Sequence, residues 1–354
     1  MKSEMTSRER ILAAINHEQT DRIPMDYWGV AEVTDMLMKR FNVKDMLGFA
    51  KSLDIDKIMD VNPGMKPINR KGMWDVEMRK IVVAGGAGVY DEPVCHPLAD
   101  FETIDEIEAN YIWPTTDMFD YSYIKKQCEL YRNEGYAIDG GYISLTYFYT
   151  TLRGIEQMLV DFATDEELAD YMLFKINEFA SAHTARILEE ANGLVDITQV
   201  TDDFGTQSSL LMSEKMIERF LGKYYVSNIA MAKSYGAKVF HHDDGAITEL
   251  IPWIIGKGCE VLNPLQWHLP GWDLRQVKSE YGNQICFHGG IDNQHVLPFG
   301  SEEEVKAEVR ACIDALYADS TGYILAPCHC IQANTPLENI LTMYKYALDY
   351  TLHR

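Results

Sequence analysis

The stretch Val239-Phe240-His241-His242-Asp243-Asp244-Gly245 ends a short hydrophobic run in a cluster of side chains that can bind metal, followed by a glycine where the backbone can turn. A second stretch, Tyr323-Ile324-Leu325-Ala326-Pro327-Cys328-His329-Cys330, repeats this pattern with thiols beside the imidazole. Two strand-like segments ending in imidazole, carboxylate or thiol groups indicate a metal held at one rim of a parallel sheet or barrel. The sequence therefore favours a metalloenzyme.

Around these stretches, short apolar runs alternate with segments of helical periodicity such as 216–234. The runs lie at 196–200, 238–240, 261–265, 284–290 and 323–326. Strands that alternate with helices form βαβ units, and near-continuous apolar strands are typical of a parallel sheet buried on both faces. We therefore predict an α/β fold, a (β/α)8 TIM barrel, with its regular β/α units over residues 137–354.

The first 110 residues have a different pattern, which predicts an N-terminal elaboration. Residues 22–29 resemble a first barrel strand, and the runs 74–79 and 81–84, followed by Gly85-Gly86-Ala87-Gly88, predict a β-hairpin. A further candidate strand runs from Tyr142 to Tyr147. Because no linker, low-complexity segment or repeat interrupts the chain, we predict a single domain over 1–354.

Five segments fit the capping box, in which a Ser or Thr at the helix N-cap is followed three residues later by Glu. They are Thr6/Glu9, Thr103/Glu106, Thr164/Glu167, Ser301/Glu304 and Thr335/Glu338, the last with Pro336 at the first helical position. These pairs predict where helices begin and carry no information on function.

Composition narrows the possible partners and compartment. The net charge of −22 argues against nucleic acid, because neutralising phosphates requires a basic surface. No apolar run approaches the roughly 18 residues that span a bilayer, and no apolar segment typical of a signal peptide follows the N-terminal methionine. Seven cysteines form an odd count that fits a reducing compartment. We therefore expect a cytoplasmic protein without a membrane or nucleic-acid partner.

The active site of a parallel α/β barrel lies at the carboxyl ends of its strands. The residues that follow the proposed strands are Tyr27, Asp202, Asp203, His241, His242, Asp244, Gln266, Trp267, His288, Asp292, Cys328, His329 and Cys330. Only one of His241 and His242 can face the interior, because adjacent strand residues point to opposite sides. Three protein ligands with one open position would form a catalytic zinc site.

Each of these features also has a structural interpretation. Cys328 and Cys330 could be small buried hydrophobes. Residues 202–207 could form a loop cap, and 288–292 a tight turn at the barrel corner. Arg153-Gly154 could bind an anion or form a surface salt bridge. The sequence has no Gly-x-Ser-x-Gly, Walker A or Gly-x-Gly-x-x-Gly motif, which disfavours hydrolase, phosphotransferase and nicotinamide chemistry.

The opening segment 7–15, followed by Asp21-Arg22-Ile23-Pro24, resembles the start of the uroporphyrinogen decarboxylase superfamily. The other segments that carry the resemblance are Arg153-Gly154, 202–207, His242-x-Asp244-Gly245, 289–292 and 335–339. The resemblance spans nearly the whole chain and implies a (β/α)8 barrel with its site at the strand carboxyl ends.

The superfamily contains true decarboxylases and corrinoid-linked methyltransferases. True decarboxylases carry an arginine-rich segment after the first strand that binds the substrate's carboxylates, whereas residues 25–32 here contain no arginine. The methyltransferases hold zinc through His-x-Cys-Gly and a later cysteine. This chain has His242-x-Asp244-Gly245 instead, and gapless counting places His329 at the second cysteine. A ligand set of nitrogen and oxygen leaves more positive charge on the metal and suits activation of an oxygen.

The resemblance therefore implies a zinc-dependent methyltransferase that demethylates an O-methyl compound, such as a methoxylated aromatic, and passes the methyl group to cobalamin on a separate corrinoid protein. We expect His242, Asp244 and His329, or a flanking cysteine such as Cys330, to hold zinc. The expected catalytic residues, which would orient the substrate, are Asp202, Asp203 and Tyr27. The expected substrate-binding residues are Trp28, Arg153, Gln207, Trp267 and His288.

Three alternatives remain open on the sequence. The methyl group could pass from a methylcorrinoid to a thiol or pterin, which a thiolate-rich site containing Cys328 or Cys330 would favour. The protein could be a metal-free decarboxylase of another acid. It could also be a ligand-binding barrel without catalysis. The sequence leaves the oligomeric state, the methyl donor and the particular corrinoid partner undetermined.

Overall fold

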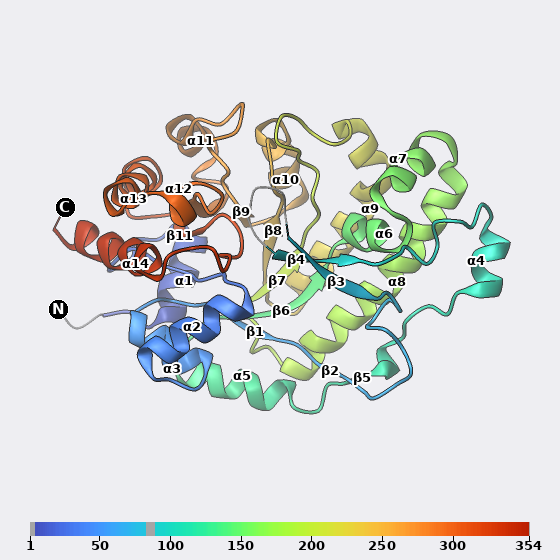
Figure 1. Cartoon of the computed structure of the whole chain (residues 1–354), viewed down its shortest axis with the longest axis horizontal. Helices are drawn as coiled ribbons and strands as arrows, with labels where there is room; N and C mark the ends of the chain where they lie inside the picture. The colour runs from blue at the N-terminus through green and yellow to red at the C-terminus, as the bar shows by residue number, and fades with distance from the viewer. Residues whose placement is uncertain (1–3, 83–88, 354) are drawn as a thin grey trace.

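In the computed structural model, which describes residues 4–82 and 89–353, seven parallel strands form one curled sheet (Figure 1). Their order in the sheet is β1-β6-β7-β8-β9-β10-β11. The strands are β1 (Met59–Val61), β6 (Ile138–Ile143), β7 (Ile197–Val200), β8 (Lys238–His242), β9 (Val261–Asn263), β10 (Cys286–Ile291) and β11 (Tyr323–Pro327). Neighbouring strands follow one another along the chain with helices between them, as the predicted βαβ pattern requires.

The segment 24–29 occupies the eighth position, between β11 and β1. On one side the Leu325 amide donates to the Pro24 carbonyl, and the Asp26 amide donates to the Leu325 carbonyl, each at 2.9 Å. On the other side the Asp56 amide donates to the Met25 carbonyl at 2.7 Å. The predicted first strand is thus present as two isolated bridges, Met25 to Leu325 and Gly29 to Ile331, and the predicted barrel is confirmed.

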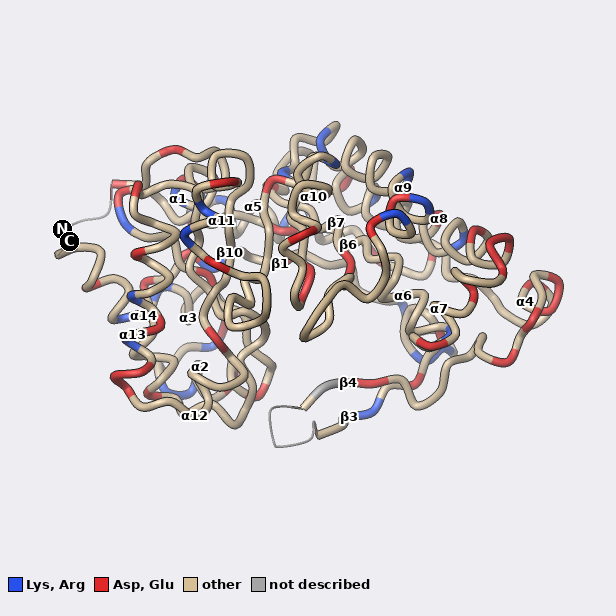
Figure 2. Tube along the Cα trace, turned by 90° about the horizontal axis from the view of Figure 1, so that it is seen from above, with Lys and Arg blue, Asp and Glu red and all other residues tan. Residues whose placement is uncertain are grey.

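Helices cover the outside of the sheet (Figure 1). They are α1 (Ser7–Ile15), α2 (Ala31–Phe41), α3 (Met46–Leu53), α4 (Ile104–Asn110), α5 (Ile124–Asn133), α6 (Leu145–Arg153), α7 (Ile155–Thr164), α8 (Glu166–Ala191), α9 (Glu214–Ser234), α10 (Ile251–Lys257), α11 (Leu274–Tyr281), α12 (Val296–Phe299), α13 (Glu302–Leu316) and α14 (Leu337–Leu352). Among the described helices, none is both long and apolar enough to cross a lipid bilayer. Asp and Glu residues occur along many of the outer elements (Figure 2).

The interior of the barrel changes from apolar to polar along the strands. At the amino end, Ile11, Ala14 and Ile15 of α1 pack against the strand residues Ile58, Ala137, Ile197, Phe240, Val261, Cys286 and Ile324. Residues two apart on a strand share a face. Two positions further on, that face presents Asp60, Asp139, Gln199, His242, Asn263 and His288. The apolar layer therefore closes the amino end, and the polar layer lies below the carboxyl-end rim.

The predicted hairpin is present, but its strands were placed wrongly. Strand β3 (Met78–Val82) pairs antiparallel with β4 (Val89–Pro93), and the predicted glycine turn falls outside the described residues. Trp74, predicted as a strand residue, is buried 4.8 Å from the Phe148 ring and precedes the hairpin. A second small ribbon pairs β2 (Gly64–Met65) with β5 (Phe119–Asp120).

The prediction of a strand from Tyr142 to Tyr147 is wrong. Strand β6 ends at Ile143, and α6 begins at Leu145. The Asp202 carboxylate, distant in sequence, accepts hydrogen bonds from the Thr146 amide and hydroxyl, both at 2.6 Å. This tertiary contact satisfies a donor in the first turn of the helix and overrides the strand propensity of the local sequence.

Three of the five predicted capping boxes are confirmed, at Thr6, Thr103 and Ser301. The other two are wrong. Asp165 caps α8 by accepting from the Leu168 amide at 3.0 Å, because α7 continues through Thr164. Helix α14 begins at Leu337 after Pro336, without a side-chain cap.

Candidate metal centre

Strand β8 divides its two histidines between opposite faces, as alternation predicts. His241 is fully buried behind the sheet, with its ring 5.7 Å from that of Tyr225. His242 faces the barrel interior, with its ring 5.5 Å from the Trp28 indole. Only His242 is therefore placed for chemistry at the barrel mouth.

The turn after β8 is tied to its neighbours. The Asp243 amide donates to the Asn263 carbonyl at 2.7 Å, and the buried Asp243 carboxylate accepts from the amides of Phe204 and Gly205 at 2.8 and 3.1 Å. These bonds anchor the backbone immediately before Asp244. The Asp244 side chain is therefore held toward the mouth by the loops after β7 and β9.

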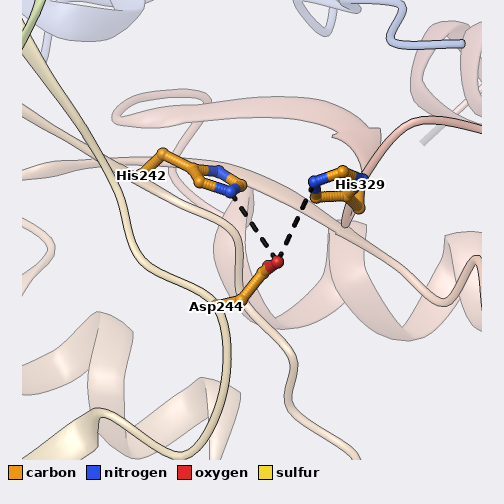
Figure 3. A group of neighbouring side chains, drawn as sticks. All are labelled: His242, Asp244 and His329. Atoms are coloured by element: carbon orange, nitrogen blue, oxygen red, sulfur yellow. Dashed lines mark ion pairs between the residues drawn. The ribbon is translucent and has the colours of Figure 1, made fainter. Parts of the chain in front are cut away.

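Three side chains meet at this mouth (Figure 3). Asp244 Oδ2 lies 3.7 Å from His242 Nε2 and 3.9 Å from His329 Nε2. One ligand atom from each residue lies within 4.8 Å of the others. His242 and Asp244 come from the end of β8, whereas His329 follows β11, so the barrel joins two segments far apart in sequence.

This group fits a divalent metal ion. Oxygen Oδ1 of Asp244 is buried without a hydrogen-bond partner, so the carboxylate has unused ligand capacity. Ligands 2.0–2.1 Å from a tetrahedral zinc ion are separated by roughly 3.3 Å, so the two distances from Asp244 Oδ2 to the histidine nitrogens, 3.7 and 3.9 Å, need to shorten by about half an ångström. The side chains of His242, Asp244 and His329 are 14%, 34% and 30% exposed, which leaves room for an open coordination position.

The surrounding charge favours a cation. Burial disfavours the charged form of His242, but the nearby Asp244 and Asp203 carboxylates outweigh it and raise the pKa of this imidazole. Asp203 Oδ1 lies 3.9 Å from His242 Nε2. The same two carboxylates would attract a metal cation bound to this imidazole in place of the proton.

The family comparison covers the part of the chain that builds this group. A family model described as Uroporphyrinogen decarboxylase (URO-D) matches residues 135–350. The chain belongs to the uroporphyrinogen decarboxylase family. Within that match lie all three members of the candidate metal group.

One solved structure shares the fold of this family member at low sequence identity. A methyltransferase from Methanosarcina mazei has a TM-score of 0.70 and 16% identity, over 98% of this chain and 99% of that chain. A B12-independent methionine synthase from Shewanella sp. W3-18-1 has a TM-score of 0.41 and 10% identity, over 78% of this chain and 74% of that chain. No curated protein matches the chain.

The cysteines beside His329 are outside the group. The Cys328 thiol is buried and donates to the Leu265 carbonyl at 3.4 Å, away from the mouth. Cys330 is half-buried, but it is absent from the set of ligand atoms within 4.8 Å. The sequence leaves open whether His329 or a flanking cysteine completes the group. In this uroporphyrinogen decarboxylase family member, His329 lies with His242 and Asp244, and neither cysteine does.

The two predicted catalytic aspartates have different environments. Asp202 is buried behind the rim and accepts from Ser144, Thr146 and the Tyr225 hydroxyl. Burial raises the pKa of Asp202 to about 7. Its predicted catalytic role is not supported, because its oxygens hold helix α6 in place. Asp203 is 52% exposed at the mouth beside His242, where a substrate can reach it.

The predicted role of Tyr27 in orienting substrate is wrong. Its ring is buried outside the barrel against Phe49, with ring centroids 4.8 Å apart, and its hydroxyl pairs with Thr34 at 2.9 Å. Burial raises the pKa of Tyr27 to about 12. The next residue, Trp28, faces inward and forms a half-buried wall beside His242, in agreement with its predicted position at the site.

The prediction that Arg153 binds substrate or forms a surface salt bridge is also wrong. Arg153 is buried and donates to the Asp161 carboxylate at 2.6 Å. It also donates to the carbonyls of Leu98 and Phe101 at 2.6 and 2.8 Å. This buried pair fixes the end of α6 to the segment before α4, so none of its charge is available to a substrate.

The remaining predicted substrate residues are separated. Gln207 is exposed on the loop after β7. Trp267 donates to the Gly290 carbonyl at 2.9 Å and lines a groove with Val296 and Phe299. His288 is fully buried in the polar layer, where it contacts Asp26 instead of the open mouth. Trp267 and His288 are thus held by other groups of the barrel, whereas Gln207 is exposed on a loop at the rim.

Sequence reasoning missed the other members of the polar layer. Asp139, Gln199, Lys57 and Asp60 line a cavity of about 20 Å³ beneath Trp28. The Gln199 amide donates to Asp139 at 2.5 Å, and burial together with the Asp60 charge raises the pKa of Asp139 to about 8. Strand alternation, applied to the strands beside His242 and His288, could have predicted the other inward-facing residues of this layer. From the sequence, β1 and β6 were not placed correctly, so these residues were missed.

Gly245 determines where Asp244 points. Its φ of +106° disfavours other residues, and a Cβ would lie 2.6 Å from the Thr206 carbonyl oxygen and 2.7 Å from the Gly205 carbonyl carbon. Gly245→Ala should therefore destabilise the protein by about 3 kcal/mol or more, from backbone strain and overlap. Urea unfolding measures this loss.

Gly193→Ala is the matched control for strain alone. Gly193 has a φ of +78°, but nothing lies within 4 Å of its added Cβ. This substitution should cost only about 1–2 kcal/mol. Equal losses in the two variants would contradict the close contact at Gly245.

Proposed function

We propose that this protein is a zinc-dependent methyltransferase that moves a methyl group from an O-methyl substrate, such as a methoxyaromatic, to the reduced cobalamin of a separate corrinoid protein. The observation that carries the proposal is the convergence of His242, Asp244 and His329 at the open barrel mouth. Similarity in fold to the Methanosarcina methyltransferase adds support for methyl transfer on this scaffold.

The chemistry follows from the donor set. An ether is a poor methyl donor because its leaving group is an alkoxide or phenoxide. A zinc ion bound by two imidazoles and one carboxylate would act as a Lewis acid toward the ether oxygen. In the overall transfer the oxygen–carbon bond would break, the oxygen would keep its electron pair and take a proton from water, and the reduced cobalt(I) of the partner would supply both electrons of the new bond to carbon.

The chain's own residues would bind and orient the substrate. Trp28 offers an aromatic face beside His242, suited to a flat ring. Asp203 is exposed next to the same imidazole and can accept a hydrogen bond from a water or hydroxyl group. The partly exposed ligands keep the mouth open to a second protein, which methyl transfer to a corrinoid carrier requires.

Two alternatives are less well supported by the geometry. Transfer to a thiol would be favoured by thiolate ligands, but Cys328 is turned away and Cys330 lies outside the group. Decarboxylation of a polycarboxylate would need free arginines near the first strand. The buried Arg10 and Arg22 instead pair with Asp56.

Metal content of the purified protein tests the proposal. We expect about one zinc ion per chain by mass spectrometry and its loss in His242→Ala, because two ligands cannot hold zinc against competing water. The control is His295→Ala, whose side chain is 77% exposed outside the group, and which should retain zinc. Wild-type protein that binds no zinc, even after incubation with the ion, would overturn the proposed metal mechanism.

A further inference from the structure

A chain of buried hydrogen bonds runs from the candidate metal group into the barrel. His242 Nδ1 lies 2.5 Å from Asn263 Oδ1, and Asn263 Nδ2 lies 2.7 Å from His288 Nδ1. His288 Nε2 lies 3.1 Å from Asp26 Oδ2. The side chains of Asn263, His288 and Asp26 are fully buried. We call these four residues the relay.

At the inner end of the relay, Asp26 determines which group donates each hydrogen bond. Its carboxylate accepts from the Trp28 indole N–H and from the Ile58 amide, both at 3.0 Å, and the Lys57 ammonium lies 3.8 Å away. Burial opposes the charged carboxylate, but the Lys57 ammonium and the hydrogen bonds from the His288 ring and the Ile58 amide outweigh it and lower the pKa of Asp26. Asp26 is therefore an acceptor, and His288 Nε2–H donates to it.

The donor and acceptor roles of the Asn263 amide then follow from those of His288. A neutral His288 that donates from Nε2 must accept at Nδ1, and so it requires the amino group of Asn263. The His288 carbonyl, 3.4 Å from Asn263 Nδ2, requires a donor at the same atom. Asn263 Oδ1 therefore faces His242 and accepts from its Nδ1–H. The lone pair of His242 Nε2 consequently points toward Asp244.

We infer that Asn263 and His288 are positioning residues that hold His242 in the Nδ1–H tautomer, with Nε2 free to bind a cation. The tautomer itself is a property of the metal-free protein; its use in binding metal rests on the proposed function. The opposite tautomer would point a proton at the position that the ion must occupy. The relay thus sets the ligand atom before any metal arrives.

The same carboxylate also fixes the aromatic wall. Asp26 holds the Trp28 indole by its N–H, and the Trp28 ring lies 5.5 Å from that of His242 and 5.7 Å from that of His288. One buried acceptor thus determines both the orientation of a metal ligand and the position of the neighbouring aromatic surface. Asp26 therefore links the position of the metal group to that of the Trp28 indole, on which a substrate ring would stack.

Nitrogen-15 NMR of the metal-free protein at alkaline pH tests the tautomer directly. The His242 signals are assigned by their absence in His242→Ala. In wild-type protein we expect a protonated Nδ1 and an unprotonated Nε2 on this ring. A His242 with its proton on Nε2 would overturn the inference, and this reading needs neither metal nor activity.

Two substitutions then test the role of Asn263. Asn263→Leu removes the acceptor at similar size, so the two tautomers of His242 should mix and zinc affinity should fall about 10–100-fold. Asn263→Asp retains an oxygen facing His242 and should keep the Nδ1–H tautomer, with zinc affinity within a few-fold of wild type.

An unchanged tautomer in the leucine variant would also overturn the inference. The wild-type spectrum decides the question even if the leucine variant fails to fold. Failure of wild-type protein to bind zinc would instead contradict the proposed function, and it would leave the tautomer result valid. The two failures are thus distinguishable.

Discussion

Asp244→Cys should retain zinc but lower methyl transfer from a methoxyaromatic by at least about 10-fold. A thiolate donates more charge to zinc than a carboxylate does, so the metal becomes a weaker Lewis acid toward an ether oxygen. The substitution restores the His-x-Cys pattern that thiol-methylating relatives are expected to carry. The cysteine Sγ is one bond shorter in reach than the carboxylate oxygens, but the longer zinc–sulfur bond of about 2.3 Å offsets part of this difference. The anchored turn around Asp243 should hold the side chain at the mouth.

Two measurements check this prediction. Metal analysis should give about one zinc ion per chain for the cysteine variant, whereas Asp244→Ala, which leaves only two ligands, should lose it. Single-turnover methylation of a reduced corrinoid protein by a methoxylated phenol gives the rate. A cysteine variant as fast as wild type, with zinc bound, would show that the harder ligand set does not determine activity toward ethers.

Asp56→Ala should destabilise the fold by about 3–5 kcal/mol, because it leaves buried cations without a partner. Asp56 is fully buried and accepts from Arg10, from Arg22 at 2.8 Å and from the Met25 amide at 3.1 Å. It ties α1, which closes the amino end of the barrel, to the segment in the eighth strand position. Urea unfolding followed by circular dichroism measures the loss.

Asp54→Ala is the matched control for this prediction. Asp54 also pairs with Arg22, at 3.3 Å, but its side chain is 67% exposed. An exposed pair contributes at most about 1 kcal/mol, so this variant should unfold close to wild type. Similar losses in the two variants would contradict the assignment of Asp56 as the anchor of the arginine pair.

The buried arginines also bear on function. Arg22 lies just before the segment 24–29 that occupies the eighth strand position. In the structure its guanidinium is engaged by Asp56 and by the Ile23 carbonyl at 3.0 Å. Charge near the amino end thus stabilises the barrel, whereas the carboxylates of Asp203 and Asp244 lie beside His242 at the opposite rim.

The sequence by itself determined the barrel and two of its rim segments. The apolar runs of β7 to β11 lie on strands that are buried along most of their length, so local pattern and burial agree. Alternation separated His241 from His242, because it depends only on backbone geometry. The His-x-Asp spacing was likewise a local property of one turn.

Only the tertiary structure decided which polar residues share a cavity and which hold the fold. Asp202 and Asp203 are adjacent in sequence, yet one caps a helix and the other reaches the mouth. Arg153 and His288 have partners from distant segments, and no local pattern encodes those pairings. Asn263 gave no signal, because an asparagine at a strand end is ordinary until its two neighbours are known to be histidines. Periodicity fixes the direction of a side chain, but closure of the barrel fixes what it meets there.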